Sequence, residues 1–117
     1  MRIMFIAEAK LIATGKKQDV TMGIRVMTLE DYITGSGPFL EKDGFFEREI
    51  GRKAEQYGSV VQVFSTYDSK RKPEDEKPFM RGINSIQFWN DGKRWWIVSV
   101  FWQAETPDNP IPRKYLN

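Results

Sequence analysis

Hydrophobic and polar positions divide the first third of the chain into two predicted strands and a short helix. β-Branched and aromatic residues predict a strand over Met4–Thr14, and "IRVMT" (24–28) predicts a second, with a charged, turn-like run between them. Thr28 stands at an N-cap position, and Asp31 follows at the position that completes a capping box. We therefore expect a helix over Leu29–Thr34 that ends in the sequence "GSGP".

Four further strands are predicted as two hairpins in the second half of the chain. The run "FFEREIGRKAEQYGSVVQVFSTYDSK" divides at Tyr57-Gly58, where a two-residue turn would pair Ala54 with Val61. The run "INSIQFWNDGKRWWIVSVFWQ" divides at Asp91-Gly92, a dipeptide typical of a type I′ hairpin turn. Together these elements predict an α+β domain with one short helix and about six strands.

The second hairpin carries large apolar side chains on both of its predicted faces. A two-residue turn pairs Trp89 with Arg94, and side chains then alternate across the sheet. One face then holds Arg81, Ile83, Ser85, Gln87, Trp89, Trp96, Val98, Val100 and Trp102, and the other holds Asn84, Ile86, Phe88, Trp95, Ile97, Ser99, Phe101 and Gln103. Burying one large apolar side chain contributes roughly 1.5–3 kcal/mol, and extended exposed apolar patches usually mark interfaces. We therefore expect both faces to be covered.

Polar residues within these faces admit two interpretations. Arg81, Ser85 and Gln87 either hydrogen-bond to one another, to water or to a loop, or they provide the polar contacts of an apolar ligand pocket. On the other face, Asn84 and Ser99 are expected to hydrogen-bond to one another, to water or to a loop.

In the first hairpin, the predicted register places Arg48 opposite Tyr67 and Glu47 opposite Asp68. Either carboxylate would have a raised pKa inside a cavity, although such residues more often lie at a solvated strand edge. Tyr67 is the better pocket candidate, because an aromatic hydroxyl can orient a ligand within an apolar wall.

Composition restricts the chemistry that this chain can perform. The absence of cysteine and histidine excludes thiol nucleophiles, disulfides, and thiolate or imidazole metal ligands, so acid–base chemistry is left to Asp, Glu, Lys or Tyr. With no calcium-loop spacing either, we expect no metal site and no cofactor. The net charge of +2, from 18 basic and 16 acidic residues, does not indicate a nucleic-acid partner. No stretch resembles a signal peptide or is long enough to cross a bilayer, so we expect a cytoplasmic protein without membrane association.

Three stretches together resemble a known superfamily: "RVMTLEDYITGSGPFLEK", "GFFEREIGRKAEQYGSVVQVFSTYDS" and "RGINSIQFWNDGKRWWIVSVFWQAETPDNPIP". They are similar to bacterial nuclear transport factor 2-like proteins, the SnoaL-like and ketosteroid-isomerase-like group, from about Ala9 to the C-terminus. The resemblance implies a cone-like half-barrel, in which a strongly curved antiparallel sheet encloses a pocket. It also implies a homodimer formed through the outer face of the sheet.

With the predicted alternation of side chains, the resemblance assigns a role to each face of the second hairpin. The ligand pocket would be lined by Tyr67, Arg81, Ser85, Gln87, Trp96, Val100 and Trp102. The dimer interface would be formed by Ile86, Phe88, Trp95, Ile97 and Phe101.

The sequence departs from the superfamily in two respects. Members usually begin with one or two helices that close the wide end of the cone, whereas this sequence begins at what resembles the first strand. We therefore expect a single domain over residues 1–117 in which the N-terminal helical part is short or missing. Catalytic members use an Asp with a Tyr or His, or an Asp–Arg–Asp set, and none of these residues can be transferred to a position in this chain.

Three functions remain open on this basis. The first is a homodimer that binds a small apolar or aromatic ligand, with no assigned catalysis. The second is an enzyme of the isomerase, cyclase or dehydratase type, with Tyr67 and Arg81 as electrophiles and Glu47 or Asp68 as base. The third is a pure association domain whose interior is filled by its own side chains.

Overall fold

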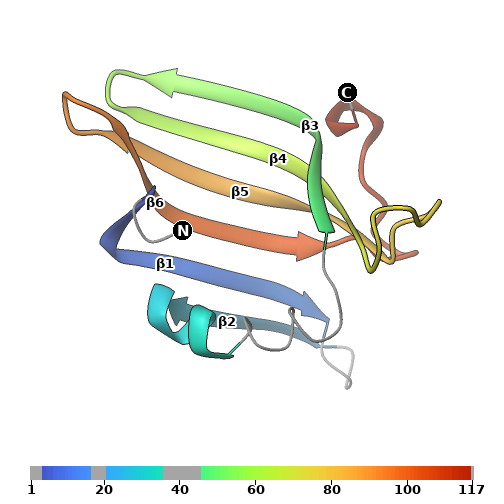
Figure 1. Cartoon of the computed structure of the whole chain (residues 1–117). Helices are drawn as coiled ribbons and strands as arrows, with labels where there is room; N and C mark the ends of the chain where they lie inside the picture. The colour runs from blue at the N-terminus through green and yellow to red at the C-terminus, as the bar shows by residue number, and fades with distance from the viewer. Residues whose placement is uncertain (1–3, 17–20, 36–45, 117) are drawn as a thin grey trace.

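Six strands form a single curved sheet within the residues that the computed structural model describes, which are 4–16, 21–35 and 46–116. The strands are β1 (Phe5–Lys16), β2 (Met22–Thr28), β3 (Phe46–Tyr57), β4 (Val60–Lys70), β5 (Met80–Asn90) and β6 (Trp95–Ala104). Their spatial order is β2-β1-β6-β5-β4-β3 (Figure 1). β1 pairs with β6 in parallel and every other neighbouring pair is antiparallel, so the sheet is mixed. The predicted α+β class, curved sheet and six strands are confirmed.

The predicted helix is present at residues 29–35, and its capping box forms as the sequence indicated. The Asp31 amide donates to Thr28 Oγ1 at 3.1 Å, and the Thr28 amide donates to Asp31 Oδ2 at 3.2 Å. These reciprocal bonds satisfy amides that the first turn of a helix leaves unpaired. Of the predicted ending "GSGP", only Gly35 lies within the described residues.

The predicted register of the first hairpin is wrong. Its turn lies at Gly58-Ser59, with Gly58 at a φ of 57°, and it pairs Tyr57 with Val60. A bulge at Ile50 then shifts the pairing again, so that Arg48 lies opposite Asp68. Glu47 lies opposite Ser69 rather than Asp68. The turn lies one residue later in the chain than predicted, because Gly58 takes its first position, where positive φ is required.

The predicted register of the second hairpin is also wrong, for two physical reasons. Asn90 pairs with Trp95, so the loop has four residues. The Asp91 carboxylate holds this loop by accepting hydrogen bonds from the Lys93 and Arg94 amides and from the Trp96 indole. Further along, a bulge at Val98 leaves this residue without a partner on β5. A bulge inserts one extra residue, so the side chains of β6 beyond it change face relative to β5.

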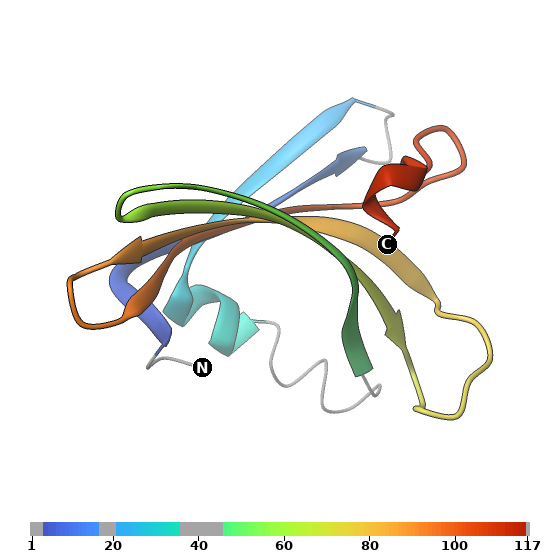
Figure 2. The same ribbon diagram turned by 90° about the horizontal axis from the view of Figure 1, so that it is seen from above.

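The two faces of the sheet are covered by different segments (Figure 2). We call the side that carries the helix the concave face. It is identified by a contact between Tyr32 of the helix and Trp102 of β6. We call the opposite side, against which the C-terminal segment 105–116 packs, the convex face. It is identified by the ring contact between Phe64 and Tyr115 and by a hydrogen bond from Thr66 Oγ1 to the Tyr115 carbonyl at 2.6 Å.

Buried apolar side chains lie mainly on the concave side. Leu11 of β1 and Met27 of β2 are paired there and nearly inaccessible, as are Leu29, Val63 and Tyr67. On the convex face, Ile111 of the C-terminal segment is buried. Many large apolar side chains on the convex face nevertheless remain exposed: Met22, Ile24, Val26, Tyr57, Val60, Phe64, Trp89 and Phe101. A single chain therefore buries a core on one side of its sheet and leaves an apolar surface on the other.

Candidate functional site on the concave face

Polar and aromatic side chains from four elements converge on the concave face and form what we call the concave cluster. Its members are Tyr32 from the helix, Glu47 from β3, Tyr67 and Ser69 from β4, and Trp102 from β6. In Figure 2 the helix (cyan) and the first residues of β3 (dark green) both lie on the hollow side of the sheet. The capping box orients the helix so that the Tyr32 ring meets the Trp102 ring edge-on, with centroids 5.9 Å apart and an interplanar angle of 76°.

The register of β3 and β4 places Glu47 beside Tyr67. Glu47 lies opposite Ser69, and Glu49, two residues along on the same face, lies opposite Tyr67. Glu49 accepts a hydrogen bond from Ser65, which confirms that these alternate residues share the concave face.

A glycine in the neighbouring strand makes room for the Tyr67 ring. Gly82 of β5 pairs with Tyr67, and a Cβ atom at position 82 would lie only 2.6 Å from Tyr67 Cζ and 2.6 Å from the Gln103 carbonyl oxygen. Any larger residue would therefore displace the ring or the β6 backbone. The glycine seats Tyr67 on the sheet, where only 3% of its surface is accessible.

The ionisable groups of the cluster perturb one another. Desolvation by the surrounding protein raises the pKa of Glu47, although the residue keeps contact with solvent. Burial, and next the Glu47 carboxylate, raise the pKa of Tyr67 to about 12. The same two causes, in the same order, raise the pKa of Tyr32. Both phenols therefore stay protonated at neutral pH, beside a carboxylate whose proton affinity is increased.

Ser69 contributes a buried hydroxyl with an unmet hydrogen-bonding capacity. Its Oγ atom is inaccessible and has no hydrogen-bond partner within the described part of the chain. Buried polar atoms are nearly always paired with protein or ordered water, so an unpaired one at a candidate site calls for an explanation. By register, this hydroxyl lies on the concave face, opposite Glu47.

An open cavity of about 400 Å³ extends along the concave face toward the hairpin tips. Its walls are mostly apolar and come from β3, β4, β5 and β6: Ala54, Val61, Val63, Ile86, Phe88 and Trp95. Its polar rim contains the ion pair between Arg52 and Glu49, with a separation of 2.8 Å. A cavity of this size and composition is typical of sites for small organic molecules.

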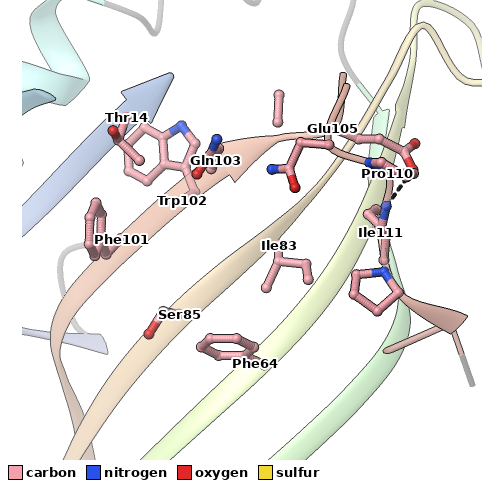
Figure 3. Close-up of a pocket in the computed structure, with 13 residues that line it drawn as sticks. Thr14, Phe64, Ile83, Ser85, Phe101, Trp102, Gln103, Glu105, Pro110 and Ile111 are labelled. Atoms are coloured by element: carbon pink, nitrogen blue, oxygen red, sulfur yellow. Dashed lines mark hydrogen bonds between the residues drawn. The ribbon is translucent and has the colours of Figure 1, made fainter. Parts of the chain in front are cut away.

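A smaller pocket, of about 270 Å³, lies on the convex face beneath the C-terminal segment (Figure 3). Phe64, Ile83 and Phe101 form its apolar floor, and Ile111 closes one side. The segment is held by Glu105, whose carboxylate accepts hydrogen bonds from Arg81 at 2.9 and 3.0 Å and from the Ile111 amide at 2.8 Å.

The structure divides the predicted pocket residues between the two faces. Three of the predicted pocket residues, Tyr67, Val100 and Trp102, lie together on the concave face. Arg81, Ser85, Gln87 and Trp96 lie on the convex face, so the predicted grouping of all seven residues around one pocket is wrong. Arg81 pairs with Glu105 there, and the Trp96 ring stacks against the Arg94 guanidinium at 3.5 Å. The cause is the bulge at Val98, which moves Val100 and Trp102 to the face opposite Ser85 and Gln87.

The residues predicted for a dimer interface are also divided. Ile86, Phe88, Trp95 and Ile97 share the concave face, and three of these four line the 400 Å³ cavity. Phe101 alone lies on the convex face, again because it follows the bulge.

Two members of the concave cluster were not among the predicted site residues. Tyr32 belongs to the apolar stripe that Leu29 and Ile33 share on the helix, and this stripe is the only signal in the sequence that it faces the sheet. Ser69 has no such signal. Of the two carboxylates weighed as bases, Glu47 lies in the cluster, whereas Asp68 lies on the convex face and pairs with Arg48 at 3.1 Å.

No group of three or more Asp, Glu, His or Cys side chains in the described residues could hold a metal ion. No helix within residues 4–16, 21–35 and 46–116 is long and apolar enough to span a membrane.

Comparisons with known proteins identify the fold. No family model matches the sequence, and no curated protein matches it significantly. A protein of unknown function with a cystatin-like fold from Nostoc punctiforme is similar in structure, with a TM-score of 0.67 and 12% sequence identity over 90% of this chain and 74% of that chain. A nuclear transport factor 2-like protein of unknown function from Shewanella baltica has a TM-score of 0.52 and 12% identity over 91% of this chain and 76% of that chain. The chain therefore has the cystatin-like cone fold of nuclear transport factor 2-like proteins.

Proposed function

We propose that the protein is a homodimer that binds a small apolar or aromatic molecule on its concave face. The observation that carries this proposal is the 400 Å³ cavity walled by Val61, Val63, Ile86, Phe88 and Trp95. Its charged groups, Glu49 and Arg52, lie at the rim and are already paired with each other, and Gln56 donates to the Gly58 carbonyl. Such a cavity favours a ligand that is recognised chiefly by burial of its apolar surface.

A fluorescent, uncharged apolar probe, N-phenyl-1-naphthylamine, tests the location of the binding site. Trp95 on the concave face and Trp89 on the convex face are matched for the comparison, because 40% and 45% of their surfaces are accessible. We expect Trp95→Ala to weaken probe binding by at least about tenfold, since the loss of an aromatic wall is worth about 1.5–3 kcal/mol. Trp89→Ala should leave the affinity unchanged. The opposite result would place the ligand on the wrong face and contradict the proposal.

The convex face supports the proposed dimer. The side chains of Ile24, Val26 and Met22 on β2 are accessible over 66%, 57% and 56% of their surfaces, and they share this face with Phe64 and Phe101. A contiguous apolar surface of this kind is typical of subunit interfaces. Two copies related by a two-fold axis would cover the same surface on each.

Light scattering coupled to size-exclusion chromatography tests the dimer. A two-fold interface contains each residue twice, so Ile24→Lys removes about 1.5 kcal/mol per copy and about 3 kcal/mol in all, a loss of more than about a hundredfold in dimer affinity. Met4→Lys is the control, because Met4 is similarly accessible at 55% and precedes β1. A wild type that is monomeric at micromolar concentration, or an Ile24→Lys variant that remains dimeric, would contradict this part of the proposal.

A second candidate function, a proton-transfer enzyme, is favoured by one observation. Glu47, a carboxylate with a raised pKa, lies beside the buried hydroxyl of Tyr67 on the concave face. This pair could act as base and hydrogen-bond donor on an acidic C–H group. Arg81 and Asp68 have no part in it, because both face the convex side. The test is deuterium exchange at the α-carbon of a panel of cyclic ketones, which Glu47→Gln should abolish.

A further inference from the structure

We propose that the concave cluster binds an organic cation, such as a methylated ammonium group, between the Glu47 carboxylate and the rings of Tyr32, Tyr67 and Trp102. This inference rests on the proposed function, because it names the chemistry of a ligand at the concave face. The cluster does not line the 400 Å³ cavity itself, but Glu47 is two residues from Glu49 of the cavity rim on the same face, so a ligand that extends from the cavity into the cluster would also carry a charge.

Glu47 differs from its neighbouring carboxylates in having no described cationic partner. Glu49 pairs with Arg52 at 2.8 Å and Asp68 pairs with Arg48 at 3.1 Å. Across the sheet, Glu105 pairs with Arg81 at 2.9 Å. Within the described ranges, no lysine or arginine makes an ion pair with Glu47, and desolvation is what shifts its pKa. The cluster therefore holds a negative charge that a bound cation could neutralise.

The aromatic members of the cluster supply the second element of cation recognition. Trp102 and Tyr32 meet edge-on at 5.9 Å, so their planes form two walls at a steep angle, and Tyr67 lies in the sheet between the helix and β3. The face of an aromatic ring attracts a cation by about 0.5–2 kcal/mol, with the larger values where water is excluded. Three rings and one carboxylate on a shared face are thus better suited to an ammonium group than to an anion.

The electrostatic potential within the concave cluster is negative, which also favours a cation. Glu47 raises the pKa of both Tyr32 and Tyr67, which means that the negative charge of its carboxylate reaches both phenols. An anionic ligand would meet the same repulsion.

The buried Ser69 hydroxyl offers a further contact. It lies opposite Glu47, has no partner in the described part of the chain and is closed to solvent, so a ligand that displaces the side chains over it would gain a hydrogen-bond partner. A ligand with a hydroxyl group near its ammonium group would use this arrangement.

Isothermal titration calorimetry with choline and its neutral carbon isostere, 3,3-dimethylbutan-1-ol, tests the inference. The two probes have nearly the same shape and differ in charge. We expect choline to bind at least about tenfold more tightly than the isostere, as a cation–π contact and one partly screened ion pair together exceed about 1.4 kcal/mol. Glu47→Gln removes only the ion pair, so it should weaken choline binding by about threefold to fivefold and leave the isostere unaffected.

Matched variants separate this site from its surroundings. Glu49→Gln removes a carboxylate from the same strand and the same face, but from a residue already paired with Arg52, so choline affinity should change by less than about twofold. Tyr67→Phe keeps the ring and should also retain binding. A ¹H–¹⁵N correlation spectrum of each variant confirms that the fold is intact, which is expected because Glu47 is accessible and makes no described ion pair.

The results distinguish this inference from the proposed function. Equal affinity for choline and the isostere, or no effect of Glu47→Gln, would overturn the cation site. If N-phenyl-1-naphthylamine still binds in a Trp95-dependent manner in that case, the proposed ligand cavity stands without a cationic ligand. If neither choline nor this probe binds, both proposals fail and the association domain is favoured.

Discussion

Replacing Gly82 with alanine tests how the concave cluster is built. The new methyl group would lie 2.6 Å from Tyr67 Cζ and 2.6 Å from the Gln103 carbonyl oxygen. Both contacts are far shorter than a carbon atom tolerates. The Tyr67 ring can move only by leaving its buried position, and the carbonyl belongs to β6, whose backbone is held by its pairing with β5. The strain must therefore appear as lost stability.

The expected magnitude follows from two opposing effects. Overpacking by one methyl group typically costs about 1–3 kcal/mol, whereas exchanging glycine for alanine returns about 0.4–1 kcal/mol by restricting the unfolded chain. We expect a net loss of about 1–2 kcal/mol, which lowers Tm by about 4–8 °C for a chain of this size. Tyr67 should also lose part of its burial, so its pKa should fall from about 12 toward the ordinary value of about 10.

Thermal unfolding and an NMR titration of ¹³C-labelled tyrosine measure these two effects. Gly15→Ala is the matched control, because a Cβ atom at Gly15 in β1 meets nothing within 4 Å. This control should be neutral or slightly stabilising. If Gly82→Ala were as stable as Gly15→Ala, with the pKa of Tyr67 still at about 12, Tyr67 would not be seated against Gly82 and the described geometry of the cluster would be refuted.

Two further predictions concern the segments that cover the sheet. Hydrogen bonds from Arg81 and from the Ile111 amide lower the pKa of Glu105, so the stability that they provide is present above the ordinary pKa of about 4.3 and is lost as the pH falls through the lower folded value. The NMR chemical shift of the Ile111 amide should follow this titration in the wild type and should no longer do so in Glu105→Gln. A titration midpoint at or above about pH 4.3 would contradict the prediction. Thr28→Ala removes one half of the capping box and should cost about 1 kcal/mol in urea unfolding, whereas Thr28→Ser should retain the box. Equal losses in the two variants would show that the hydroxyl does not cap the helix.

Local sequence determined the elements of this fold and their order. The capping box at Thr28 and Asp31 depends on residues three apart, so it could be predicted without tertiary contacts. The alternation of apolar residues and the turn sequences near Gly58 and Gly92 located both hairpins for the same reason. The apolar content of both hairpin faces likewise indicated that neither face is a simple solvent surface.

Tertiary structure decided the register, and with it the composition of each face. Bulges at Ile50 and Val98 each insert one residue; Gly51 beside the first is a sequence signal for a bulge, whereas nothing in the local pattern marks the second. The insertion at Val98 moved Val100 and Trp102 to the face of the sheet that Ser85 does not share. This change divided both the predicted pocket residues and the predicted interface residues. The parallel pairing of β1 with β6 and the contact of Tyr32 with Trp102 join residues far apart in sequence, so only the folded chain brings them together. The elements followed from interactions between near neighbours, whereas the site depends on which side of the sheet each residue reaches.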